Sequence, residues 1–449
     1  MAKDHYIISR DSIKEPPDGI LKSLRFLGPG FILSASIVGS GELIATTALG
    51  AKAGFTAFWV IIVSCLVKVA VQLEFGKHTI QSGETVMHAF GLLPGSKNGK
   101  NKWAVWIVFL LTLLKVVQVA GILGGSALVL KLLFPSVAFP LLVIASAVIA
   151  GALIFKGWYV LVEKFSLLMM TLFTALTLVC LFYVQYTPFA FTFREVIAGM
   201  EFSLSGELMI IALGAFGITG VASDEIIAYT YWCIEKGYAA YTGPVEDTDA
   251  WRRRAKGWIK VMYLDAVAAM IVYTTVTATF YLLGASVLHK QGLVPDGDSM
   301  VQTLAGIYTS SLGKGAENVF LVGAYFVLFS SVFATLAYWS RLFTDIAGQF
   351  KWIDFYNAKD RTKIIRWVSI LFPALWSATY LYINLPLVMI ISGGIVGSVL
   401  LILVIFAALQ FRYKRIQYIK PSPIYDGALW LSIISILGIS VYSLYSLFS

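Results

Sequence analysis

Long apolar stretches alternate with short polar segments along almost the whole chain. A stretch of about 20 apolar residues is long enough to cross the roughly 30 Å hydrocarbon core of a bilayer as an α-helix. The pattern therefore predicts an all-α polytopic membrane protein with a single transmembrane domain over 26–449, after an N-terminal segment of 25 residues. Eleven spans are expected, near 26–50, 55–76, 103–130, 137–155, 158–185, 208–232, 259–284, 317–344, 367–383, 386–411 and 427–447.

The composition supports this class. Of the 449 residues, 58% are hydrophobic and only 13% are charged, and the mean hydropathy is +0.80. A soluble domain with this composition would have too little polar surface to stay in solution. The first 24 residues are polar and contain Pro16-Pro17, so we expect no cleavable signal peptide.

The basic residues fix the orientation of the predicted spans. If the N-terminus is cytoplasmic, 26 of the 34 Lys and Arg residues lie on the cytoplasmic side and five on the outer side. This bias is a strong positive-inside signal. It also explains the net charge of +9 without nucleic acid as a partner. We expect a monomer in the lipid bilayer of the cytoplasmic (inner) membrane of a prokaryote.

Two of the spans are interrupted by glycine followed by serine and acid. Span 1 contains Gly39-Ser40-Gly41-Glu42, and span 6 contains "ITGVASDE" at 218–225. Glycine weakens a helix, and a carboxylate at bilayer depth is costly. Both spans are therefore predicted to unwind there, and the freed carbonyl groups at the end of each first half-helix would attract a cation.

The two interruptions occupy corresponding places in two halves of the chain. Repeat one covers about 26–185, repeat two about 208–411, and an extra helix follows at about 427–447. Glycine-interrupted spans at matching positions indicate the central site of a transporter. We therefore predict an ion site, with Glu42, Asp224 and Glu225 as metal ligands, built from Gly39, Ser40, Gly41, Glu42, Gly220, Val221, Ala222, Ser223, Asp224 and Glu225.

A second interpretation of the acids stays open. Ser40 and Ser223 are good N-cap residues, and acids in a first helical turn complement the helix dipole. Glu42, Asp224 and Glu225 would then cap the second half-helices without binding an ion.

Three further polar residues inside spans are candidates for coupling or gating. Lys115 lies well inside span 3 and needs a partner, with Gln118 one turn later. Asp265 in span 7 is expected either to pair with a basic residue at the inner end or to line the inner vestibule. In span 10, the small residues of "ISGGIVGS" (391–398) predict close contact with another helix.

The stretch "LGPGFILSASIVGSGELIATTALGAKAGFTAFWV" (27–60) resembles the opening of the NRAMP family of divalent-metal transporters. The similarity continues through "FGKHTIQSGETVMHAF" and "GGSALVLKLLF". The resemblance implies the leucine-transporter (LeuT-type) fold, in which two inverted five-helix repeats are followed by one extra helix. It also implies that no cofactor is needed beyond the transported ion.

The family's metal ligands are missing from this chain. Where the family has Asp-Pro-Gly-Asn, this chain has residues 39–42, so the aspartate that binds metal and takes part in proton coupling is absent. The Met-Pro-His motif of span 6 is absent too, and Val119 and Ile122 replace the acidic pair of span 3. The chain is therefore identified as a divergent member of an NRAMP-related branch.

The remaining oxygen donors favour a hard cation. Carboxylate and hydroxyl oxygens suit Mg²⁺, Mn²⁺ or Ca²⁺ better than later transition metals. Mg²⁺ keeps several waters and needs a roomy pocket, which Gly39, Gly217, Gly220 and Ala222 would provide. We predict transport of Mg²⁺ or Mn²⁺ by alternating access without the family's usual proton coupling. The alternatives are a transporter of a small organic solute or amino acid and a non-transporting relative.

An enzyme is not expected. The four histidines, His5, His78, His88 and His289, lie outside the spans or at their edges, where they form no catalytic set. Three cysteines within or at the ends of apolar spans indicate neither a disulfide framework nor a metal-thiolate site.

Overall fold

The computed structural model describes residues 4–95, 102–157, 159–295, 297–313, 315–415, 419 and 422–448. Each of the eleven expected spans is helical. Span 1 runs through α2 (Pro29–Ile37), η3 (Val38–Thr46) and α3 (Thr47–Ala53), and span 3 through α6 (Trp103–Leu114) and α7 (Val116–Leu133). Span 6 consists of α11 (Met209–Ile218) and α12 (Ser223–Lys236). The other spans are α4 (Phe58–Ser82), α8 (Phe139–Phe155), α9 (Tyr159–Val184), α14 (Asp249–Leu283), α17 (Ala316–Gln349), α18 (Ala358–Ile383), α19 (Pro386–Gln410) and α20 (Pro423–Phe448).

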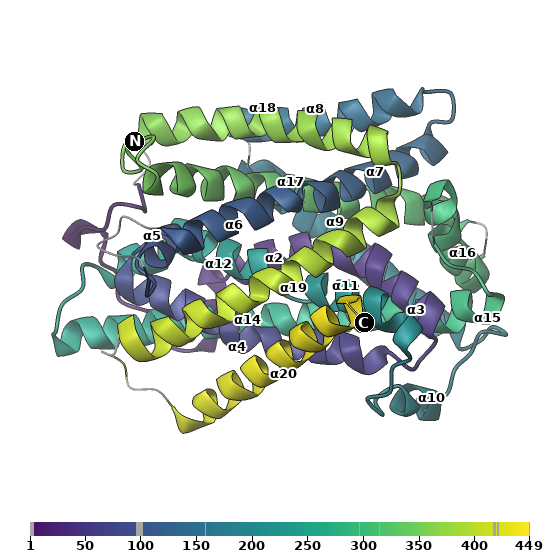
Figure 1. Cartoon of the computed structure of the whole chain (residues 1–449), viewed down its shortest axis with the longest axis horizontal. Helices are drawn as coiled ribbons and strands as arrows, with labels where there is room; N and C mark the ends of the chain where they lie inside the picture. The colour runs from purple at the N-terminus through teal and green to yellow at the C-terminus, as the bar shows by residue number, and fades with distance from the viewer. Residues whose placement is uncertain are drawn as a thin grey trace.

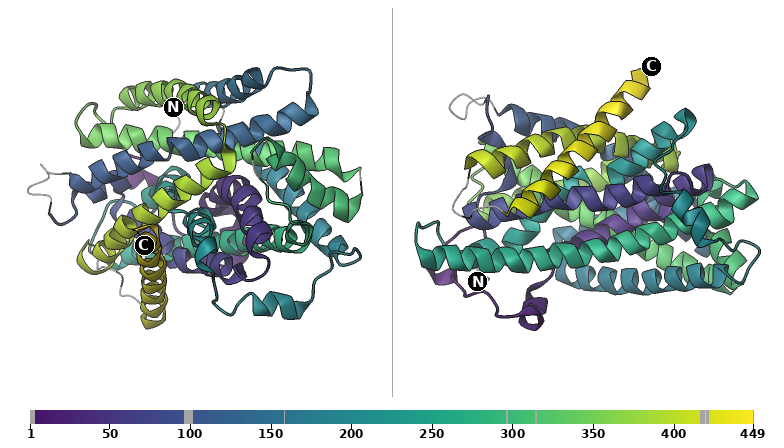
Figure 2. Two further views of the ribbon diagram at one scale, coloured as in Figure 1. Left: turned by 45° about the vertical axis from the view of Figure 1, so that its right-hand side comes forward. Right: turned by 90° about the horizontal axis from the view of Figure 1, so that it is seen from below.

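The long helices run side by side, and short helices lie at the two ends of the bundle (Figures 1 and 2). In the part of the chain that the structure describes, seven helices are long and apolar enough to cross a membrane. The chain from Asp4 to Ser12, α5 (Val86–Gly91) and the first turns of α14 and α18 lie at one end. At the opposite end lie α10 (Phe193–Ala198), α15 (His289–Gln291) and α16 (Met300–Leu312). The segments rich in Lys and Arg therefore share the end that the charge pattern assigns to the cytoplasm.

Span 6 is broken where the sequence predicts. Between α11 and α12 the backbone is extended at Thr219 and again at Ala222, and Gly220 has a φ of +59°. Only glycine adopts this conformation without strain, and a Cβ on Gly220 would lie 2.8 Å from the Cα of Cys65. The break is therefore fixed both by the conformation of Gly220 and by its contact with α4.

Span 1 is not unwound, which corrects the expectation for this span. Its backbone stays helical and adopts a wider π-helical segment over Val38–Thr46. Such segments are rare and occur frequently at functional sites. A Cβ on Gly39 would overlap the carbonyl oxygen of Val327 and the Oγ of Ser331 on α17. Gly39 is thus required by close packing against α17, not by an extended backbone.

Glycines also bring α11 and α19 into contact, as predicted for the small residues of span 10. A Cβ on Gly217 would overlap the carbonyl group of Gly394, and a Cβ on Gly394 would overlap that of Gly214. The two helix backbones therefore pack directly against each other next to the break in span 6.

Replacing Gly217 by alanine should force α11 away from α19 and destabilise the fold. We expect a loss of about 1–3 kcal/mol, the usual cost of overpacking, measured as a lower thermal unfolding temperature of the purified chain. Gly306→Ala on α16 is the matched control, because a Cβ there has no atom within 4 Å. An equal effect of both substitutions would contradict the packing argument.

Candidate functional site

A small, partly open cavity lies beside the break in span 6. Its volume is about 30 Å³, which is room for one or two water molecules or a single bare ion. It lies between spans 1, 3, 6 and 8. The polar side chains on its wall come from Ser36, Gln118, Asp224, Glu225, Thr335 and Tyr338. The apolar lining comes from Ile32, Leu33, Val119, Ile122, Ile218, Ala222, Ala228, Trp232 and Ala334.

Asp224 already has a cation beside it. The ammonium of Lys115, at the junction between α6 and α7, donates a hydrogen bond to Oδ1 of Asp224. Lys115 is 1% exposed, and Asp224 is largely buried. A lysine inside a span was expected to need a partner. For Lys115 this partner is the carboxylate of Asp224 in span 6.

Glu225 combines a capping role with a place on the cavity wall. Its Oε2 accepts a hydrogen bond from the backbone N–H of Ala222 at 2.9 Å, at the start of α12. Oε2 of Glu225 thus acts as a helix cap, as the capping interpretation predicts. The side chain also lines the cavity next to Asp224.

Glu42 lies outside the cavity lining and is fully buried. Its Oε1 accepts a hydrogen bond from the backbone N–H of Gly220 at 3.1 Å. Its Oε2 accepts one from Oγ1 of Thr46, also at 3.1 Å. Glu42 therefore satisfies the broken backbone of span 6 from the π-helical segment of span 1, as a capping residue does.

The three predicted metal ligands do not form one ligand set. Within the described residues, no group of three or more His, Cys, Asp and Glu side chains is placed to hold a metal ion. The reason is that Glu42 bonds to the backbone of the break, whereas Asp224 and Glu225 line the cavity. Of the three, only Asp224 and Glu225 lie on the cavity wall.

A second lysine occupies the C-terminal end of α11. The ammonium of Lys68, on α4, donates hydrogen bonds to the carbonyl oxygens of Phe216 and Thr219, the latter at 2.8 Å. Lys68 is fully buried, and the Oγ of Ser64 lies 3.0 Å from each of the same two oxygens. The freed carbonyls that sequence reasoning assigned to a transported cation are therefore bound by the protein's own ammonium group.

Several polar atoms around the cavity have no hydrogen-bond partner among the described residues. They are Oε1 of Gln118, the hydroxyl of Tyr338 and the Oγ of Ser223. A buried polar atom without a partner is costly, so such atoms indicate a place where water or an ion binds. Gln118 and Ser223 were predicted, but Tyr338 on α17 was missed because a tyrosine in an apolar span has no distinctive sequence signal.

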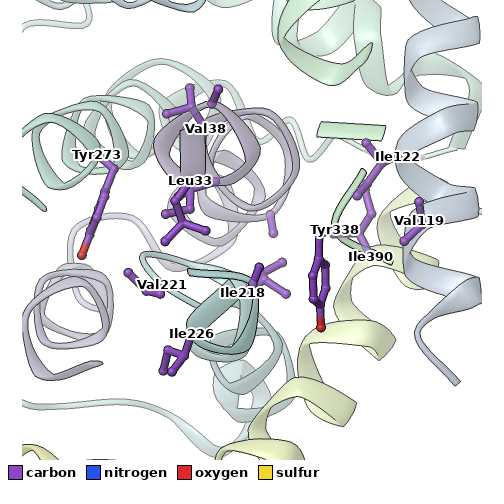
Figure 3. Close-up of a cluster of buried hydrophobic side chains, with 14 of the residues drawn as sticks. Leu33, Val38, Val119, Ile122, Ile218, Val221, Ile226, Tyr273, Tyr338 and Ile390 are labelled. Atoms are coloured by element: carbon purple, nitrogen blue, oxygen red, sulfur yellow. The ribbon is translucent and has the colours of Figure 1, made fainter. Parts of the chain in front are cut away.

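Apolar side chains fill the remainder of the centre (Figure 3). Val119 and Ile122 project from α7 toward Tyr338, and Ile218 lies at the end of α11 on the same side. Val221 in the break is fully buried and lies away from this group. The positions that the resemblance assigned to the lost acidic pair are thus at the cavity and are apolar.

The other predicted residues lie elsewhere. Asp265 accepts hydrogen bonds from the N–H groups of Gly28 (2.7 Å) and Gly30 (2.6 Å) and from the Tyr229 hydroxyl (3.2 Å). It thus caps the start of α2 and lines no part of the cavity.

The side chains of Ser40 and Gly41 lie outside those that the structure describes. Cys65, Cys180 and Cys233 are free and buried.

The chain is similar to several proteins of known sequence or structure. A relative from Pasteurella multocida (strain Pm70), the uncharacterized protein PM0681, is 24% identical over 333 residues, which cover 70% of this chain and 69% of that protein. A variant of the manganese transporter of Eremococcus coleocola superposes with a TM-score of 0.60 at 13% identity, covering 98% of this chain and 99% of that one.

Two transporters solved with other ligands share the architecture. MhsT in complex with L-phenylalanine gives a TM-score of 0.61 at 16% identity, over 96% of this chain and 100% of that one. MHP1, a nucleobase-cation-symport-1 family transporter, gives 0.59 at 14% identity, over 94% and 90%. These likenesses confirm the LeuT-type fold.

The family model for natural resistance-associated macrophage protein-like sequences matches residues 30–446. This match covers nearly the whole transmembrane domain, including both repeats and most of the extra helix. The membrane protein described here therefore belongs to the natural resistance-associated macrophage protein-like (Nramp) family.

Proposed function

We propose that this protein carries a hard divalent cation, Mg²⁺ or Mn²⁺, across the cytoplasmic membrane of a prokaryote by alternating access. The observation that carries the proposal is the carboxylate pair, Asp224 and Glu225, on the wall of a buried cavity at the break in span 6. Membership of the Nramp family and the likeness to a manganese transporter support it.

The ion pair between Lys115 and Asp224 allows the lysine and the transported cation to alternate at the same carboxylate. Without an ion, the ammonium of Lys115 compensates the buried charge of Asp224. A divalent cation entering the cavity attracts both carboxylates and repels Lys115, because interactions between charges are strong in a buried site. The ammonium of Lys115 thus balances the charge of Asp224 whenever the metal ion is absent, so the transport cycle requires no proton.

The cavity as it stands is too small for a fully hydrated ion. An octahedral shell of six waters needs about 60–90 Å³ of cavity volume, at about 10–15 Å³ for each water, against about 30 Å³ here. The cation must therefore lose most of its water here, or the cavity must widen around it. Mg²⁺ gives up water reluctantly, so Mg²⁺ transport depends on widening more than Mn²⁺ transport does.

Flux measurements in proteoliposomes test the proposal. We expect Mg²⁺ or Mn²⁺ influx with the wild-type protein, and a loss of at least about tenfold in Asp224→Asn and in Glu225→Gln because each removes a ligand charge. Glu201→Gln, at an exposed acid outside the spans, is the matched control. Wild-type flux in both site variants would refute the role of the carboxylate pair, and proton movement with the metal would refute the uncoupled cycle.

A small organic cation is the second candidate, because most of the cavity lining is apolar and includes Trp232 and Tyr338. Such a solute is larger than a bare ion, so it too requires the cavity to widen. The same vesicles distinguish the two. Uptake of a labelled amino acid or organic amine that depends on Asp224, without metal flux, would favour this candidate.

A further inference from the structure

Helices α8 and α18 lie side by side at the outer edge of the bundle (Figure 1). An apolar groove runs between them. Its volume is about 700 Å³. Small residues form much of its wall, among them Ala147 and Gly151 on α8 and Ala374 and Ala378 on α18. A Cβ on Gly151 would come within van der Waals overlap of the Ser369 carbonyl oxygen, so this glycine lets the two helices approach closely. We call this feature the α8–α18 groove.

The groove ends in a basic hollow near the start of α18. The hollow has a volume of about 530 Å³ and shares Phe155 and Ile370 with the groove. Lys359, Lys363 and Arg366 line it, and no acidic side chain does. Their spacing of four and three residues places all three cations on one face of α18.

These three cations are not neutralised by the protein. None of them takes part in an ion pair among the described residues. The guanidinium of Arg366 lies 5.2 Å from the ring centre of Phe155, at the junction of hollow and groove. Trp367, which is 64% exposed, stands beside it. An exposed tryptophan next to basic residues is typical of the membrane–water interface.

We propose that the α8–α18 groove and its basic hollow bind an anionic phospholipid of the cytoplasmic leaflet. The phosphate would lie among Lys359, Lys363 and Arg366, and an acyl chain would fill the groove. The charge pattern assigns this end of the bundle to the cytoplasm, where anionic lipids attract basic residues close to the membrane. The site lies apart from the central cavity, so the proposal is independent of the transported ion.

The arrangement fits a lipid better than a second copy of the chain. Two copies in one membrane related by a two-fold axis along the bilayer normal would place the same cations opposite each other, and like charges across an interface are unfavourable. A free phosphate ion would use the cations but leave the apolar groove without a function. A lipid uses both parts at once.

Native mass spectrometry of the full chain tests the proposal, with phosphatidylglycerol and phosphatidylcholine added separately to the detergent-purified protein. We expect the wild type to retain phosphatidylglycerol in clear preference. Since a basic residue near the membrane surface contributes roughly fivefold, Lys359→Gln, Lys363→Gln and Arg366→Gln together should reduce the preference by at least about tenfold. Ala374→Phe with Ala378→Phe should weaken retention while leaving the cations in place, because the added rings fill the groove.

Arg253→Gln, Lys256→Gln and Lys260→Gln form the matched control, since they remove three exposed cations at the same end of the bundle. We expect this variant to bind lipid as the wild type does. Equal retention of both lipids by the wild type, or equal loss in the two triple variants, would overturn the proposal. A dimer that dissociates on filling the groove would also overturn it, in favour of a second copy as the occupant.

Discussion

Lys115→Met should cost this protein about 3–5 kcal/mol of stability, which is the usual result of removing one partner of a buried ion pair. The methionine fills a similar volume but leaves Asp224 charged and largely buried without its cation. We expect a clearly lower unfolding temperature for the purified protein. Adding Asp224→Asn to the same chain should recover most of the loss, because the uncompensated charge is then gone. This recovery would appear as a large coupling energy in a double-mutant cycle.

The same variant separates ion binding from a merely structural ion pair. If a divalent cation competes with Lys115 for Asp224, Mn²⁺ should raise the unfolding temperature of Lys115→Met more than that of the wild type. Ligands that bind only the folded state stabilise it in this way. Lys260→Met, at an exposed position on α14, is the control for the loss of a lysine. If Lys115→Met unfolds at the wild-type temperature, or if Mn²⁺ raises the unfolding temperature of both proteins equally, the proposed competition is contradicted.

The spans and one of the two breaks could be predicted because local sequence decides them. Long apolar stretches must be helical in a bilayer, since every backbone group needs an internal partner. Gly220 marks the break in span 6 through a conformation that few other residues adopt. Gly39 has a different reason, which is the close approach of Val327 on α17. A contact of that kind depends on the tertiary fold, so the sequence alone did not distinguish a π-helical segment from an unwound one.

The partners of the buried charges were harder to predict for the same reason. Lys68 reaches a carbonyl group 148 residues away in the chain, and Lys115 reaches a carboxylate 109 residues away. Glu42 and Asp224 were expected to converge because both follow glycine and serine at similar predicted depths. Depth follows from the position along a span, whereas the direction of a side chain around the helix axis depends on packing. This is why the sequence did not show that Glu42 lies apart from Asp224 and Glu225.

The two buried lysines, Lys68 and Lys115, balance the negative groups at the break in span 6. The C-terminal end of α11 and the carboxylate at the start of α12 are both places that favour a cation. Lys68 binds the first and Lys115 the second. Both ammonium groups come from neighbouring spans, so the charge balance of the break is maintained while no ion is bound. A site of this kind is stable when empty, which suits a carrier that must return without cargo.

Lys68→Ala should therefore be the second severe substitution. It removes the charged donor from the carbonyl groups of Phe216 and Thr219, which are buried at the break. Hydrogen bonds to a charged group contribute about 1.5–3 kcal/mol each, so we expect a loss of about 3 kcal/mol or more, together with most of the transport activity. Lys52→Ala, at an exposed position at the end of span 1, should leave both properties unchanged.

The vacated space provides a sharper test of the role of Lys68. If the carbonyl groups form a cation site that the lysine fills, a small cation from solution should replace the missing ammonium. We expect Na⁺ or methylammonium to restore both the unfolding temperature and the metal flux of Lys68→Ala in a concentration-dependent manner, while the wild type does not respond. If neither cation restores either property, Lys68 stabilises packing alone. The end of α11 would then have no affinity for a cation beyond the hydrogen bonds that the lysine itself makes.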